Sequence, residues 1–159
     1  MKKLNFVIII LFSMLCATAY SQQKKGKDLD NENGSSMRPI IFELDTLVNI
    51  VENSFKAQIV RMEFDIVKDT AYSVRMLYPG FKYGIFAYGD YRLCKIGVDI
   101  MKQNEGKMEY VTSGNFDEKS CTTLGWVEPT EPTLYTFKIY AADRKPDFKG
   151  AHYGIIIFN

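Results

Sequence analysis

The stretch TAYSVRMLYPGFKYGIFAYGD, residues 70–90, decides the fold of this chain of 159 residues. In its first half, apolar side chains stand at every second position (72, 74 and 76), which is the period of a β-strand. Pro79 and Gly80 then interrupt the pattern with residues typical of a tight turn. The second half is apolar at neighbouring positions, as in a strand inside a sheet. The stretch therefore predicts two strands joined by a turn.

The same period of two extends along most of the chain. Gly, Pro, Asn and Asp separate the short runs, and NEGK at residues 104–107 predicts a hairpin turn. The further runs are residues 62–66, 94–100, 108–112, 122–126, 135–141 and 153–157. The pattern predicts a mainly all-β fold, an antiparallel jelly-roll-like β-sandwich of about eight strands over about residues 61–159.

One segment has the period of a helix instead. Its apolar residues recur three or four apart, with polar residues on the other side: Leu44, Leu47, Val48, Val51, Phe55, Ile59 and Met62. Pro39 lies upstream, where a helix begins but does not continue. We expect an amphipathic helix over about residues 42–58 that packs on the domain; the alternative is that it docks a partner.

The N-terminal segment predicts export. Residues 1–21 combine two lysines, an apolar run over residues 6–15 and small residues, as in a secretory signal peptide. Cleavage after Ser21 is preferred over cleavage after Ala19. A lipoprotein is not favoured, because Leu15 rather than a small residue precedes the cysteine at position 16. We expect a periplasmic or secreted protein.

The mature chain divides into two parts. Residues 22–38 are polar and predict a flexible tether, and residues 39–159 are long enough for a single domain. Loss of Lys2 and Lys3 leaves 18 basic against 19 acidic residues, a formal charge near −1. This balance and the lack of a basic patch argue against nucleic acid as a partner. No further apolar run is long enough to span a membrane, so we expect no membrane insertion of the mature chain.

Two cysteines, Cys94 and Cys121, remain after cleavage. An even pair in an oxidising compartment favours a disulfide. The alternatives are two buried thiols, or a metal or catalytic role.

Several phrases resemble the bacterial pre-peptidase C-terminal domain, a β-sandwich appended to many secreted proteases. They are residues 70–90, GVDIMKQNEGKMEYV (97–111), LGWVEPTEPTLYTFKIYA (124–141) and HYGIIIFN (152–159). The resemblance implies a stand-alone, non-catalytic exported sandwich. Some members of that family bind calcium, but this chain has Gly97 and a single Asp99 where the family tends to have two acids. A mature start of Gln-Gln also resembles exported proteins of Bacteroidetes-type bacteria.

Residues with a chemical role are few. His152 is the only histidine, without the signature of a nucleophile, and we expect it exposed at a strand end. Asp90, Asp99 and Asp117 are the candidate calcium ligands, although solvated loop charge accounts for them as well. We expect no catalytic residue and no other cofactor.

Aromatic residues are dense around one predicted hairpin. Tyr78, Tyr83, Tyr88 and Tyr91 are the candidate binding residues, because neighbouring strand residues face opposite ways and cannot all be buried in one core. Packing beneath the helix is the alternative.

The leading hypothesis is an exported, non-catalytic binding or accessory module that recognises a protein or a glycan through a sandwich face or loops. A structural or assembly role in the cell envelope is the alternative. A small hydrolase is the third hypothesis, and it would need a pocket with His152 or two close carboxylates.

Overall fold

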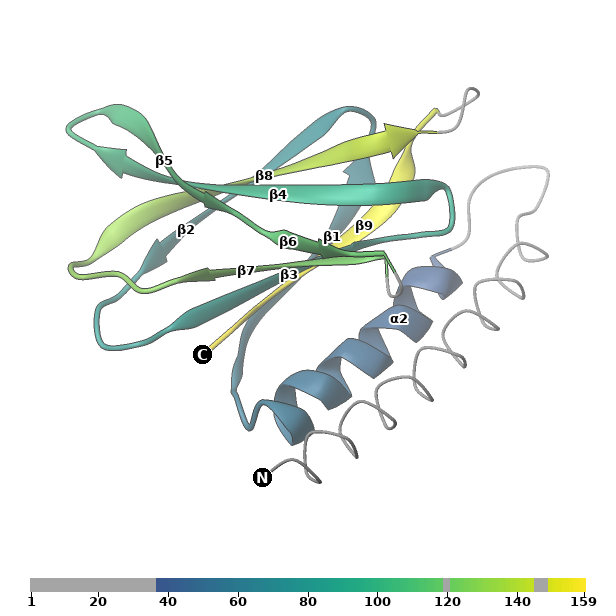
Figure 1. Cartoon of the computed structure of the whole chain (residues 1–159), viewed down its shortest axis with the longest axis horizontal. Helices are drawn as coiled ribbons and strands as arrows, with labels where there is room; N and C mark the ends of the chain where they lie inside the picture. Colours follow the sequence, from purple (N-terminus) through teal and green to yellow (C-terminus); the bar gives the residue numbers. More distant parts are fainter. Residues whose placement is uncertain (1–36, 119–120, 145–148) are drawn as a thin grey trace.

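The computed structural model describes residues 37–118, 121–144 and 149–159 (Figure 1). In these ranges one α-helix, α2 (Arg38–Asn49), continues into a π-helical turn, η2 (Ile50–Ser54). The strands are β1 (Ile59–Val67), β2 (Thr70–Leu77), β3 (Tyr83–Gly89), β4 (Leu93–Asn104), β5 (Lys107–Ser113), β6 (Asn115–Asp117), β7 (Thr122–Val127), β8 (Thr133–Arg144) and β9 (Ala151–Phe158). The predicted signal peptide and most of the predicted tether lie outside the described residues.

The strands form two antiparallel sheets that face each other. One sheet has the order β1-β9-β3-β7-β6, and the other has the order β2-β8-β4-β5. Apart from the three-residue β6, this is the strand order of a jelly roll. The prediction of a mainly all-β sandwich with one helix is confirmed.

The hydrophobic core between the sheets is built by one side of each strand. Phe137 and Ile139 from β8 meet Ile85 from β3 and Ile155 from β9, all at most 1% exposed. Since β3 and β9 lie inside the five-stranded sheet, both of their faces are buried, which explains their continuous apolar sequence.

A second hydrophobic cluster lies on the outer side of that sheet, where α2 packs on β9 and β3 (Figure 1). Ile40, Leu47 and Val51 of the helical segment are at most 2% exposed there. Burial of each such side chain stabilises the fold by about 1.5–3 kcal/mol. The helix therefore belongs to the domain, and only one of the two sheets has a helix on its outer face among the described residues.

The bounds of the helix differ from the expected residues 42–58. α2 begins at Arg38, because Pro39 occupies the first turn, where its missing N–H leaves no hydrogen bond unmade. The helical segment ends after Ser54, and Lys56 has a positive φ of 55°. Ile59, which fitted the helical spacing, begins β1 instead.

The NEGK hairpin lies where the sequence predicts it. Asn104 pairs with Lys107, and the two residues between them have positive φ values, 49° at Glu105 and 78° at Gly106. A two-residue turn of this kind matches the twist of the strands that it joins.

Candidate functional site

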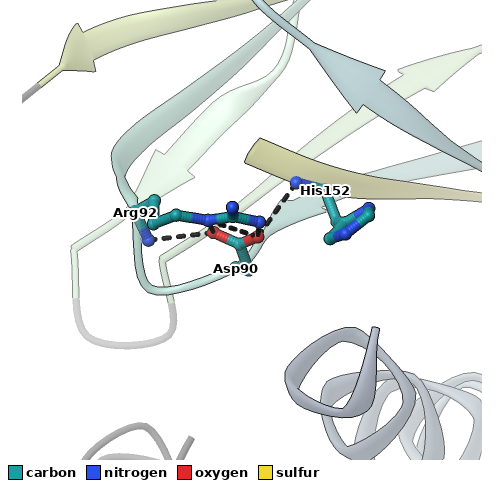
Figure 2. A network of polar contacts seen from close by, with 3 residues as sticks. All are labelled: Asp90, Arg92 and His152. Carbon is teal, nitrogen blue, oxygen red and sulfur yellow. Dashed lines mark hydrogen bonds and ion pairs between the residues drawn. The ribbon is translucent and has the colours of Figure 1, made fainter. Parts of the chain in front are cut away.

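Asp90 is the centre of a buried polar corner at the end of β3 (Figure 2). Its side chain is fully buried and pairs with the guanidinium of Arg92, whose Nε lies 3.0 Å from both carboxylate oxygens. The carboxylate also accepts hydrogen bonds of 2.9 Å from the backbone N–H of Arg92 and from that of His152. Asp90 thus joins the β3–β4 connection to β9.

His152 is 8% exposed in β9, so the expectation of an exposed histidine is wrong. Its burial follows from its position, because β9 lies between β1 and β3. Figure 2 shows the imidazole directed away from the Asp90 carboxylate, which binds the backbone amide of His152. A catalytic Asp–His pair would need that carboxylate on the ring. The corner therefore has the geometry of a structural contact.

The three candidate calcium ligands lie apart in the fold. Asp90 is in the corner, Asp99 is in the middle of β4, and Asp117 ends β6. The Asp99 carboxylate accepts a hydrogen bond of 2.6 Å from Ser113 Oγ and lies 3.6 Å from Lys138 Nζ. Within the described ranges, no three residues of the types His, Cys, Asp and Glu come close enough to hold a metal ion. Calcium binding stays a prediction without a matching set of ligands.

The four candidate binding tyrosines separate into two groups. Tyr83 is 4% exposed in the core between the sheets, and Tyr88 is fully buried under α2. These two are corrections, because a buried ring offers no surface to a ligand. Tyr78 is 55% exposed directly after β2, and Tyr91 is half-buried.

The four-stranded sheet, β2-β8-β4-β5, has no helix on its outer side among the described residues. We call this outer side, which carries exposed apolar side chains, the open face. It includes the following outward side chains of β2, β8, β4 and β5: Thr70, Tyr72, Val74, Met76, Leu134, Thr136, Lys138, Tyr140, Gly97, Asp99, Met101, Gln103, Met108, Tyr110 and Ser113. The most exposed apolar members are Tyr72 and Tyr110, at 63% and 66%, while Val74, Met76 and Met108 are between 41% and 48% exposed.

The strand register arranges the open face in rows. One row crosses all four strands and is nearly apolar: Val74, Thr136, Met101 and Tyr110. Its polar neighbour is the row Tyr72, Lys138, Asp99 and Ser113. Since side chains opposite each other in register share a face and lie about 4.5–5.5 Å apart, each row is a continuous strip.

The polar row is tied together by its own side chains. Ser113 Oγ donates to Asp99, and it lies 2.9 Å from Tyr110 Oη, the last member of the apolar row. Tyr140 Oη also donates to Asp99, over 3.4 Å. Burial, followed by the charge of Asp99, raises the pKa of Tyr140. These contacts hold the tyrosine rings in place on an otherwise flat surface.

A second group of aromatic rings lies on the other sheet, at the end of the helical segment. Phe55, Phe86, Trp126 and Phe158 have ring centroids 5.3–6.2 Å apart. Phe55 and Trp126 are 43% and 38% exposed, and Lys82 Nζ lies 5.1 Å from the Trp126 ring centroid. We call this group the aromatic corner. The Trp126 ring is thus contacted by Lys82 over the ring and by Phe158 at an interplanar angle of 82°.

Glu43 of α2 is an acid whose pKa is shifted by its surroundings. Burial raises the pKa of Glu43 to about 7. It faces Tyr88, whose pKa is raised by burial and then by the charge of Glu43, and whose buried hydroxyl has no hydrogen-bond partner among the described residues. A cavity of about 400 Å³ lies on the outward side of the helix instead, lined by Asp45, Thr46, Val48, Asn49, Glu52 and Asn53. Glu43 does not line this cavity.

The two cysteines are placed by their strands. Cys94 is in β4, and Cys121 directly precedes β7. Ile96 lies two residues after Cys94, and Thr123 lies two residues after Cys121. Thr123 Oγ1 donates a hydrogen bond of 2.5 Å to the Ile96 carbonyl, so β4 and β7 approach each other here across the sandwich. The side chain of Cys94 is outside the described part of the chain, and the disulfide stays a prediction.

Sequence reasoning missed most of the open face. The alternation over residues 72–76 gave the period correctly, but the apolar side of β2 faces outward, while Ser73 and Leu77 are buried. No signal in the sequence marks this inversion, because burial of a serine without a hydrogen bond is unfavourable and Ser73 would ordinarily be expected to face outward. Arg92, two residues after Asp90, was missed as well.

None of the described helices is both long and apolar enough to cross a membrane. The fold and its surfaces define a mainly all-β jelly-roll sandwich with a helix on one outer face and, within the part of the chain that the structure describes, no covering element on the other.

No protein-family model matches the sequence, and no curated protein matches it either. Among solved structures, the chain is similar to the pre-peptidase C-terminal domain of a collagenase from Bacillus anthracis, with a TM-score of 0.45 and 13% identity over 61% of this chain and 87% of that chain. It is also similar to PliG, a periplasmic inhibitor of g-type lysozyme from Aeromonas hydrophila (TM-score 0.43, 9% identity, 62% and 85% covered). A third is the mitogen of Yersinia pseudotuberculosis, with a TM-score of 0.46 and 6% identity over 64% of this chain and 85% of that chain. The first is a domain of the kind that the sequence phrases resemble, and the likeness is one of sandwich fold.

Proposed function

We propose that this protein is an exported, non-catalytic binding module that docks a protein partner through the open face. The observation that carries the proposal is the row Val74, Thr136, Met101 and Tyr110, which crosses all four strands without a covering element among the described residues. The row is apolar except for Thr136, which is 8% exposed. Contiguous exposed apolar patches are rare on soluble monomers and mark interaction surfaces. Export rests on the signal-peptide pattern of residues 1–21.

The chemistry of the open face favours a protein over a glycan. Three methionines, Met76, Met101 and Met108, give it polarizable and adaptable side chains, which suit the irregular apolar surface of a protein. Tyr72 and Tyr110 add rigid rings of the type that dominate protein interfaces. Sugar recognition would instead favour a concave site with several polar groups around a free ring.

A catalytic role has less support. The Asp90 carboxylate binds the backbone amide of His152, and Glu43, the acid with the raised pKa, does not line the cavity. Envelope assembly remains compatible with the same open face, and the difference lies in the identity of the partner.

A photo-crosslinking amino acid in place of Met101 tests the proposal in cells that export the protein. We expect a protein adduct of defined mass that is lost when Tyr110→Glu is added. The matched control is a crosslinker at Phe42, an apolar residue of α2 that is 56% exposed. Equal adducts from both positions, or none from position 101, would contradict docking through the open face.

A further inference from the structure

We propose that the partner on the open face is a second copy of this chain, packed face to face about a two-fold axis that runs along the strands between β8 and β4. This inference rests on the proposed function and names its partner. A two-fold interface requires a self-complementary surface, in which residue i contacts residue j and residue j contacts residue i. The rows of the open face meet that requirement in both size and charge.

The geometry follows from the strand order β2-β8-β4-β5. A two-fold axis along the strands, midway between β8 and β4, places β8 of one copy over β4 of the other and β2 over β5. Positions along the strands are preserved by this rotation, so each row lies on its own counterpart. Stacked sheets pack about 10 Å apart, a distance that interdigitating side chains fill.

Side-chain sizes alternate favourably in the apolar row. The rotation places the small Val74 opposite the large Tyr110 of the second copy and the small Thr136 opposite its Met101. Large side chains thus face small ones, which is the arrangement that close packing needs. Thr136 is the recessed position of the row, since it is 8% exposed and its hydroxyl lies 4.0 Å from the Met108 sulfur of its own chain.

Charges are complementary in the polar row. Lys138 of one copy faces Asp99 of the other, while each also pairs with its neighbour in its own chain, 3.6 Å away. Four alternating charges come together at the interface, so no like charges face each other directly. A heterologous partner would explain the apolar row equally well, but it would not require this internal symmetry.

The area of the open face is adequate. Tyr72 and Tyr110, with nearly two thirds of each exposed, offer about 250 Å² together. Val74, Met76 and Met108 add a similar amount, for about 500 Å² from five residues per copy. The remaining residues of the face bring the total toward the roughly 800 Å² per partner of a standard interface.

A cysteine pair tests the register directly. Val74→Cys and Tyr110→Cys lie in the same row but three strands apart, about 14 Å, too far for a disulfide within one chain. In the proposed dimer the two positions face each other between copies. Since stacked sheets lie about 10 Å apart, also beyond the reach of a disulfide, the facing thiols need a short bismaleimide crosslinker. Added to a mixture of the two single variants, it should yield a covalent heterodimer with a 74–110 linkage by peptide mapping, and neither variant alone should yield that linkage.

Sedimentation of the exported chain gives the second readout. We expect a dimer whose dissociation constant rises about 100-fold in Met101→Lys, because a lysine would be buried at the centre of the interface. The matched control is Met62→Lys, on a methionine that is 44% exposed on β1, and it should leave the dimer unchanged. Circular dichroism checks that both variants are folded.

The outcomes separate the two proposals. A monomeric wild type, or a dimer that Met101→Lys does not weaken, overturns the second copy as partner. If the crosslinker at position 101 then captures a different protein, docking through the open face stands. If it captures nothing, both proposals fail.

Discussion

Replacement of Asp90 by alanine should destabilise the domain by about 3 kcal/mol. Its carboxylate satisfies two backbone N–H groups and the Arg92 guanidinium. An unsatisfied buried N–H costs about 1–3 kcal/mol, and His152 donates its N–H from a fully buried strand. The Arg92 side chain is 24% exposed and recovers part of its hydration, so loss of the ion pair adds only about 1 kcal/mol.

The conservative variant separates these contributions. Asp90→Asn keeps one oxygen for the His152 amide but presents an amide group to Arg92, so we expect about half of the alanine effect. Urea unfolding measures both variants, and the midpoint should fall while the slope stays constant. For a domain of this size the alanine variant should lower the Tm by about 10 °C.

A double-mutant cycle decides whether Asp90 acts through its contacts. Arg92→Met removes the partner, and Asp90→Ala combined with Arg92→Met should cost clearly less than the sum of the two single variants. Asp45→Ala, on the exposed side of α2, is the control for loss of a carboxylate and should change stability by less than about 0.5 kcal/mol. Additive effects in the cycle, or an Asp90→Ala variant as stable as the control, would refute the structural role of the corner.

Three further predictions concern the helix, the pH dependence and the cysteines. Gly154→Ala should cost about 3 kcal/mol in thermal unfolding and loosen α2, because a Cβ there would lie 2.3 Å from the Tyr88 ring carbon Cζ. Glu43 has a folded pKa of about 7 against an ordinary 4.5, so the folded state binds more protons between these values and stability falls as the pH rises through this window, by up to about 3 kcal/mol. Glu43→Gln should remove that slope and be more stable than the wild type at pH 8 but not at pH 4; an unchanged slope would contradict burial of the acid. Cys94 and Cys121 should appear as one linked peptide pair in mass spectrometry without reductant, and reduction should lower stability by about 3–4 kcal/mol, as expected for a closed loop of about 28 residues; full alkylation of both thiols in the native protein would exclude the bridge.

Local chemistry made much of the fold predictable. The two-residue period and turn residues such as Gly106 identify strands and hairpins directly, because each follows from backbone geometry. The helix was recognisable from its apolar spacing, but its start depended on whether Pro39 stands before the helix or inside its first turn.

The faces of the strands were not predictable in the same way. Periodicity shows that residues 72, 74 and 76 share a side, but not which side meets the other sheet, and here the apolar side faces out. Tyr88 and Tyr83 illustrate the same limit, since one lies under the helix and the other between the sheets. The Asp90 contacts also depend on His152, 62 positions further along the chain, which only the sheet order brings close.

The position of β9 has a consequence for the timing of folding. This strand lies between β1 and β3, and Ile59 pairs with Phe158, so the five-stranded sheet joins segments that are nearly one hundred residues apart in sequence. Until β9 is available, β1 and β3 have no shared neighbour and the second hydrophobic cluster lacks Ile156 and Phe158. A chain that emerges gradually from a ribosome would therefore lack this inner strand of the five-stranded sheet until residues 151–158 have been synthesised. The five-stranded sheet and its second hydrophobic cluster can therefore close only after residues 151–158 are available.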